Sequence, residues 1–100
     1  MLNIKLVNKG TEGILLLNGP IDSTTSPKLE TIFLQMAERF DRLVLDLADV
    51  QYITSAGLRV IRKVYMVMLK KSGSLVMRNV NDVIMEVFEM TKLVGYLKFE

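Results

Sequence analysis

The chain of 100 residues contains no cysteine and no histidine. The missing cysteines exclude disulfides, thiol catalysis and thiolate metal sites. Without histidine the chain also lacks the commonest general base, the Ser-His-Asp and Cys-His pairs and the usual zinc sites. Neither the Walker pattern nor the dinucleotide glycine pattern occurs. We therefore expect no enzyme, no metal and no cofactor.

The chain also has only a small net charge and no long apolar run. Thirteen basic and eleven acidic residues leave a net charge of +2, which is too small to indicate direct nucleic-acid binding. The longest apolar run, 64–69, is far shorter than a membrane span, and the first residues do not resemble a signal peptide. With 50% hydrophobic residues, the sequence predicts a single soluble, cytoplasmic domain over 1–100.

Apolar periodicity and turn residues predict the order β-β-α-β-α-β-α-β. The expected strands are 4–7, 14–17, 42–50, 74–80 and 93–99, and the expected helices are 27–40, 58–71 and 81–90. Ser26 is the expected N-cap of the first helix, with Pro27 at its first position, and Asn81 or Asp82 caps the third. Strand-helix-strand crossovers require parallel neighbours. The predicted fold is a small mixed sheet with its helices largely on one face.

The stretch "YITSAGLRVI" joins the central strand to the second helix and carries two hydroxyl residues. The carboxyl edge of a parallel strand is the usual functional edge of an α/β sheet. Ser55, at or next to the N-cap, would hold its hydroxyl near free helix amides, where a phosphate is stabilised. The simpler interpretation is that Thr54 and Ser55 only cap the helix, while Asp22 caps a loop and Asp46 ends a strand.

The second helix is apolar over a broad arc. One face carries Leu58, Ile61, Tyr65 and Met68, and Val60, Val64 and Val67 form another apolar row. Such a helix is either heavily buried or presents an adhesive face beside the Ser55 turn. Both interpretations stay open from the sequence.

Three segments, in register along the chain, carry a resemblance to a known family. They are "LNGPIDSTTSPKL", "LVLDLADVQYITSAGLRVI" and "GSLVMRNVNDVIMEVFEMTKLVGYLKF". Together they resemble STAS domains, specifically the small anti-sigma factor antagonists of bacterial partner-switching systems. The family motif Asp-Ser-Ser/Thr-Gly-Leu aligns its acceptor with Ser55, its glycine with Gly57 and its leucine with Leu58. The family's aspartate stands where this chain has Thr54, which supplies a second hydroxyl as an alternative acceptor.

The resemblance implies a function as well as a fold. In the family, the unphosphorylated antagonist binds an anti-sigma factor that is a serine kinase, and so frees the sigma factor. Phosphorylation of the serine releases the partner, and a metal-dependent serine phosphatase reverses it. The sequence leaves the oligomeric state open, and we expect a monomer outside this heterocomplex. The implied partner-binding residues are Asp22, Ser23, Thr54, Ser55, Ala56, Gly57 and Arg59. The resemblance also suggests that Asp22 and Asp46 lie near Ser55, where they would repel an attached phosphate. The alternative is a constitutive scaffold or ligand-sensing STAS module in which Ser55 is only a helix cap.

Overall fold

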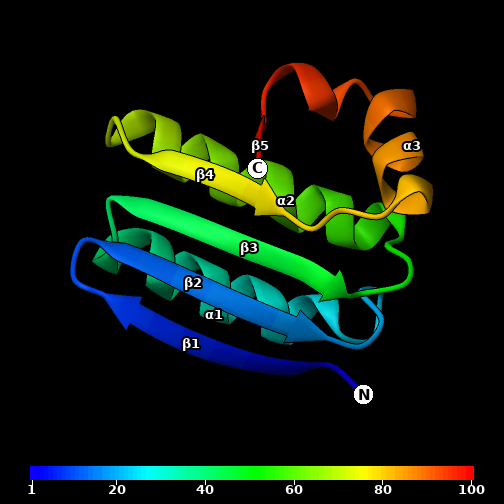
Figure 1. The fold of residues 1–100 in the computed structure, drawn as a ribbon, viewed down its shortest axis with the longest axis horizontal. Helices are drawn as coiled ribbons and strands as arrows, with labels where there is room; N and C mark the ends of the chain where they lie inside the picture. Colours follow the sequence, from blue (N-terminus) through cyan, green and yellow to red (C-terminus); the bar gives the residue numbers. More distant parts are fainter.

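The computed structural model describes the backbone of residues 1–100 and the side chains of all of them except Val94. Its elements follow the predicted order, with a short 3-10 turn added before the last strand (Figure 1). In chain order they are β1 (Asn3–Lys9), β2 (Glu12–Asn18), α1 (Ser26–Arg39), β3 (Arg42–Asp49), α2 (Ser55–Lys70), β4 (Ser74–Arg78), α3 (Asp82–Met90), η1 (Leu93–Gly95) and β5 (Lys98–Phe99).

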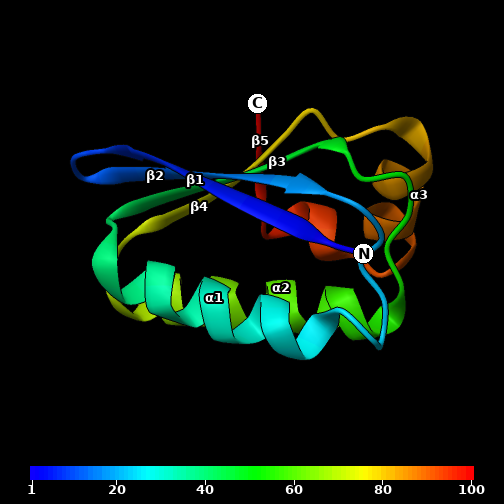
Figure 2. The ribbon, with the colours of Figure 1, turned by 90° about the horizontal axis from the view of Figure 1, so that it is seen from below.

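The five strands form one mixed sheet in the order β1-β2-β3-β4-β5. The β1–β2 hairpin is antiparallel, whereas β2, β3, β4 and β5 are parallel to one another. Figure 2 shows α1 and α2 side by side beneath the sheet, with α3 at one end. The predicted mixed sheet with helices on one face is therefore confirmed.

Strand alternation separates the two faces of the sheet. Leu43, Leu45 and Leu47 of β3 join the main core, which lies between the sheet and helices α1 and α2. Val44 lies on the opposite face in a small cluster with Ile14 and Val76. Around this second cluster runs a chain of ion pairs in which Arg42 contacts Glu12 and Glu100, and Arg78 contacts Glu100.

Val60 and Val64 of α2 belong to the core rather than to an adhesive face, and Val67 packs against it partly buried. Val60 and Val64 are 5% and 0% exposed, and both pack in the main cluster with Ile61 and Met68. On α3, Val83 is 61% exposed and lies outside the core. Ile84 and Phe88 are the buried residues of that helix.

Several predicted boundaries differ from the structure, and two of the differences have a clear local cause. Helix α1 begins at Ser26, with Thr25 rather than Ser26 as its N-cap. The reason is local, because the amide and the hydroxyl of Ser26 both donate to the carbonyl of Asp22 and so draw Ser26 into the helix. The predicted last strand is reduced to Lys98–Phe99, since Lys92 adopts a left-handed conformation and the 3-10 turn η1 follows it. Asn81 caps α3 as predicted and accepts from the amide of Ile84.

Candidate functional site

The site is built where two loops meet at the carboxyl ends of β2 and β3. An isolated parallel bridge pairs Ile21 with Ile53, and the amide of Thr54 donates to the carbonyl of Ile21 at 2.9 Å. A second link runs from the amide of Gly19 to the carbonyl of Asp49 at 3.1 Å. The loop that carries Asp22 is thereby fixed beside the turn that carries Ser55.

Gly57 makes this close approach possible. A Cβ at position 57 would overlap Cγ2 of Ile21 and lie 2.7 Å from Cγ1 of Ile53. Gly57 is itself buried. Its part in the predicted partner surface is therefore indirect, because it lets the first turn of α2 pack against the bridge between the loops.

The two candidate hydroxyls lie in different environments. Thr54 is the N-cap, with extended backbone, and Ser55 is the first helical residue. Ser55 is thus next to the N-cap as predicted, but α2 begins three residues before the expected start at 58. Oγ1 of Thr54 is buried and has no hydrogen-bond partner among the described residues, whereas Ser55 is exposed. Since no side chain caps α2, the amides of its first turn are free of side-chain acceptors. A group attached to Ser55 would meet these amides.

Asp22 organises its own loop. Its carboxylate accepts from the amides of Thr24 and Thr25 at 2.9 and 3.0 Å, and from the hydroxyl of Thr25 at 3.3 Å. These bonds favour the charged carboxylate, and the amide of Thr25 is the main cause of the lowered pKa of Asp22. The acid is therefore ionised at neutral pH and held half-buried beside the bridge.

Asp46 does not belong to the site, which corrects the expectation that it would lie near Ser55 together with Asp22. It alternates with Leu45 and Leu47 of the main core, so its side chain is on the sheet face opposite α2. There its carboxylate accepts from Nδ2 of Asn79 at 3.1 Å and from the amide of Ala48 at 3.0 Å.

Three predicted partner-binding residues come together in a depression between the first turns of α1 and α2. Its volume is about 350 Å³, and its lining comprises Ser23, Ser26, Pro27, Glu30, Ala56, Arg59 and Val60. Arg59 is exposed one turn after Ser55 and forms no ion pair among the described side chains. Its guanidinium is thus a free cation near the exposed hydroxyl.

Two neighbours of the site were missed from the sequence. Glu30 lines the same depression and pairs with Lys63 at 3.2 Å, which links α1 to α2. Tyr52 is 47% exposed and lines a second hollow of about 250 Å³ with Gly19 and Asp49. The available signal for Tyr52 was an aromatic residue two positions before Thr54, whereas nothing local marked Glu30.

Neither a metal-binding cluster nor a membrane-spanning helix occurs among the described residues. Among them, no group of three or more carboxylate side chains gathers closely enough to hold a metal ion. None of the described helices is long and apolar enough to cross a membrane.

Comparison with known proteins identifies the class. The STAS domain model matches residues 3–100, and the chain belongs to this family. The anti-sigma-B factor antagonist of Bacillus subtilis is 31% identical over 94 residues, which cover 92% of this chain and 86% of that protein. BtrV of Bordetella bronchiseptica is 33% identical over 91 residues, covering 88% and 78% of the two chains. The chain is thus homologous to anti-sigma factor antagonists, which are regulators rather than enzymes.

The fold also matches that of a protein solved in a phosphorylated form. The Bacillus cell fate determinant SpoIIAA in its phosphorylated form superimposes with a TM-score of 0.77 at 11% identity, covering 98% of this chain and 91% of the other. At that identity the likeness shows the shared fold alone.

Proposed function

We propose that this protein is an anti-sigma factor antagonist in which the charge on Ser55 controls partner binding. The observation that carries the proposal is the exposed Ser55 hydroxyl at the first position of α2, beside a buried Thr54 hydroxyl. Homology to the B. subtilis antagonist supports the class of function, and SpoIIAA, which has the same fold and was solved in a phosphorylated form, is consistent with a phosphate on this fold.

The fold tolerates a phosphate at Ser55 for electrostatic reasons. The N-terminus of a helix carries roughly half a positive elementary charge, which stabilises an anion there. A phosphoserine carries about −1.5 to −2 charges near neutral pH. Because Ser55 is exposed, the phosphate keeps its hydration and need not displace any core residue. Phosphorylation therefore changes the surface without unfolding the domain.

Arg59 gives the switch a second component. Residues four apart on a helix are neighbours, so a phosphate on Ser55 lies within reach of the free guanidinium of Arg59. In the unmodified protein Arg59 is available to an acidic group of the partner. In the modified protein the phosphate competes for it, and the new negative charge stands beside ionised Asp22. The partner then loses a cationic contact and meets an anionic surface.

The proposed partner is an anti-sigma factor that is also a serine kinase, and a metal-dependent serine phosphatase restores the unmodified state. The surface offered to the kinase consists of Asp22, Ser23, Thr54, Ser55, Ala56 and Arg59, with Gly57 holding it together from beneath. Thr54 stands in the place of the family's aspartate, but its buried hydroxyl is poorly placed to accept a phosphate.

The test uses the serine-kinase anti-sigma factor from the same organism, with ATP, followed by mass spectrometry of the modified peptide. The expected result is one phosphate on Ser55, absent in Ser55→Ala and retained in Thr54→Val. Phosphate on Thr54 would overturn the assignment of the acceptor. No phosphate at either position, with equal partner binding by wild type, Ser55→Ala and Ser55→Asp, would favour the constitutive scaffold instead.

A further inference from the structure

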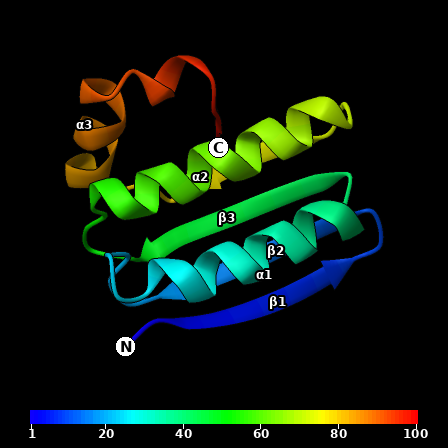
Figure 3. The same ribbon diagram turned by 180° about the vertical axis from the view of Figure 1, so that it is seen from behind.

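A groove lies between the second half of α2 and the segment that joins α3 to β5. In Figure 3, α2 faces the viewer and this segment runs along its side toward the C-terminus. The groove has a volume of about 520 Å³. It is lined by Arg62, Tyr65, Met66, Leu69, Thr91, Lys92, Leu93 and Tyr96.

The groove is lined by several solvent-exposed apolar side chains. Met66, Leu69 and Tyr96 are 44%, 54% and 63% exposed. Tyr96 also packs against Tyr65, with ring centroids 6.1 Å apart and planes inclined by 54°. Clustered exposed methionine, leucine and tyrosine are typical of protein-binding surfaces, because methionine adapts its shape and tyrosine supplies rigid contact area.

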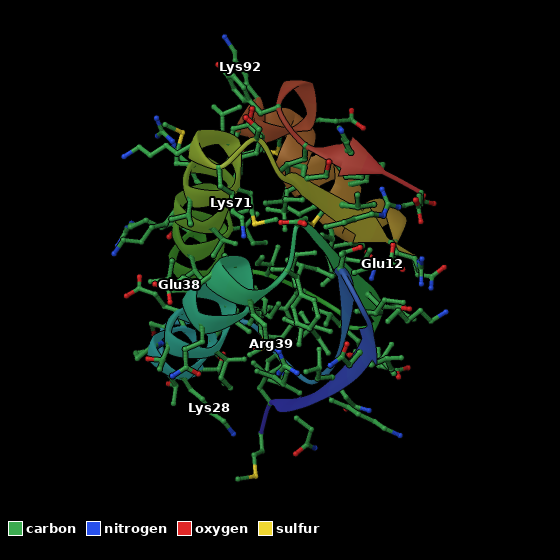
Figure 4. All side chains as sticks on the ribbon, turned by 90° about the vertical axis from the view of Figure 1, so that its left-hand side faces the viewer. Glu12, Lys28, Glu38, Arg39, Lys71 and Lys92 are labelled. Carbon is green, nitrogen blue, oxygen red and sulfur yellow. The ribbon has the colours of Figure 1, made fainter. Side chains whose placement is uncertain are left out.

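The charges of the groove have one sign. Arg62 and Lys92 are both exposed, and neither forms an ion pair among the described side chains. No carboxylate belongs to the lining. In Figure 4, Lys92 lies at the edge of the molecule, far from the labelled Glu12 and Glu38. The groove is therefore an apolar strip with unneutralised cations from both walls.

We infer that this groove binds an acidic amphipathic segment of a partner protein, with apolar side chains against Met66 and Leu69 and carboxylates toward Arg62 and Lys92. Charge complementarity favours this occupant. A second copy of this chain is disfavoured, because two grooves placed face to face would bring four uncompensated cations together.

The groove is separate from the Ser55 switch. At about 1.5 Å of helix rise per residue, Arg62 lies roughly 10 Å and Leu69 roughly 21 Å along α2 from Ser55. The Debye length is about 8 Å at physiological ionic strength, so most of the groove is screened from a phosphate on Ser55. The inference therefore goes beyond the proposed function, and binding in the groove is independent of the phosphorylation state.

The test is a selection of displayed random peptides against the full chain, followed by titration calorimetry with a selected synthetic peptide. The expected peptides alternate apolar residues with Asp or Glu. Arg62→Glu and Leu69→Ser are expected to weaken their binding roughly tenfold or more, as losses at interface anchors do. Ser55→Asp is expected to change it less than about twofold, since that charge is screened.

Two matched variants control for the substitutions. Lys70→Glu makes the same kind of charge change on α2 outside the groove, and Val83→Ser removes an exposed apolar side chain from α3. Both should bind the peptide as wild type does. Each of the following results would overturn the inference: no binder sensitive to Leu69→Ser, selected peptides without acidic residues, equal losses in Arg62→Glu and Lys70→Glu, or a dimer of the free protein that Leu69→Ser dissociates. Loss of peptide binding in Ser55→Asp would also refute independence from the switch, whether or not Ser55 proves to be phosphorylated.

Discussion

The amide of Thr54 donates a 2.9 Å hydrogen bond to the carbonyl of Ile21, and this contact joins two loops that are distant in the sequence. It belongs to an isolated bridge between Ile21 and Ile53, outside the regular sheet. Because of it, the loop of Asp22 and the turn of Ser55 form one surface. The candidate site therefore depends on how well this bridge is packed from below.

Gly57→Ala tests that packing. The added Cβ would overlap Ile21 and lie 2.7 Å from Ile53, so the bridge must shift. We expect the free energy of unfolding to fall by about 1–3 kcal/mol, the usual range for overpacking. Urea denaturation measures it. Gly95→Ala is the control, because a Cβ there meets nothing within 4 Å. Equal effects at the two positions would contradict the packing role of Gly57.

Ser55→Asp separates binding from stability. The new carboxylate lies at the exposed first position of α2, where helix polarity stabilises a negative charge by about 0.3–1 kcal/mol. We expect the thermal midpoint to stay the same or rise slightly, while affinity for the anti-sigma factor falls at least about tenfold, the equivalent of 1.4 kcal/mol. Calorimetry measures both quantities. Binding as tight as that of wild type would show that charge at this position is not the switch.

Thr54→Val is expected to stabilise the fold, although it removes an N-cap hydroxyl. Oγ1 of Thr54 is buried without a partner among the described residues, and an unsatisfied buried polar group costs about 1–3 kcal/mol. We expect a gain of about 1 kcal/mol in the free energy of unfolding. Thr25→Val is the contrasting variant, because the Thr25 hydroxyl donates to Pro20 and accepts from the amide of Asp22. A loss of stability in both variants would mean that the Thr54 hydroxyl is satisfied in solution.

Asp22→Asn should produce a pH-dependent loss of stability. The pKa of Asp22 is lowered in the folded protein, chiefly by the amide of Thr25. The folded state therefore stabilises the charged carboxylate more than the unfolded state does. This stability is present above the ordinary aspartate pKa of 3.8 and disappears as the pH falls through the lowered value. The difference between wild type and Asp22→Asn should therefore be largest near neutral pH and shrink in acid. Urea titrations at several pH values measure it, and a constant difference would contradict the role of the charge.

Lys71→Met should loosen the end of α1. The ammonium of Lys71, just past α2, donates to the carbonyls of Ala37 and Phe40 at 2.9 and 3.0 Å, and Figure 4 shows it directed between the two helix ends. A cation at a helix C-terminus that also satisfies carbonyls contributes about 1–2 kcal/mol. Lys70→Met is the neighbouring control, since Lys70 is exposed and makes no such contact among the described side chains. Chemical denaturation that shows equal losses would contradict the capping role.

Much of the fold was readable from periodicity because strands and helices bury residues at different spacings. The leucines of β3 and the apolar face of α2 indicate their elements without any tertiary information. The ends of elements were less predictable, since they depend on single contacts. Hydrogen bonds from Ser26 to the carbonyl of Asp22 extended α1 by one residue, and the 3-10 turn η1 shortened the final strand.

The sequence by itself determined the family, the order of the elements and the candidate hydroxyls Thr54 and Ser55, because these depend on local pattern and motif order. Only the tertiary structure decided which hydroxyl is exposed, since burial depends on the loop of Ile21 that crosses beside Thr54. It likewise placed Asp46 on the far face of the sheet and buried Val60 and Val64 of α2. Neighbours such as Leu45 and Asp46 are separated because successive residues of a strand point to opposite faces of the sheet. Distant residues such as Ile21 and Ile53 are joined because the loops that follow two adjacent strands meet at one edge of the sheet.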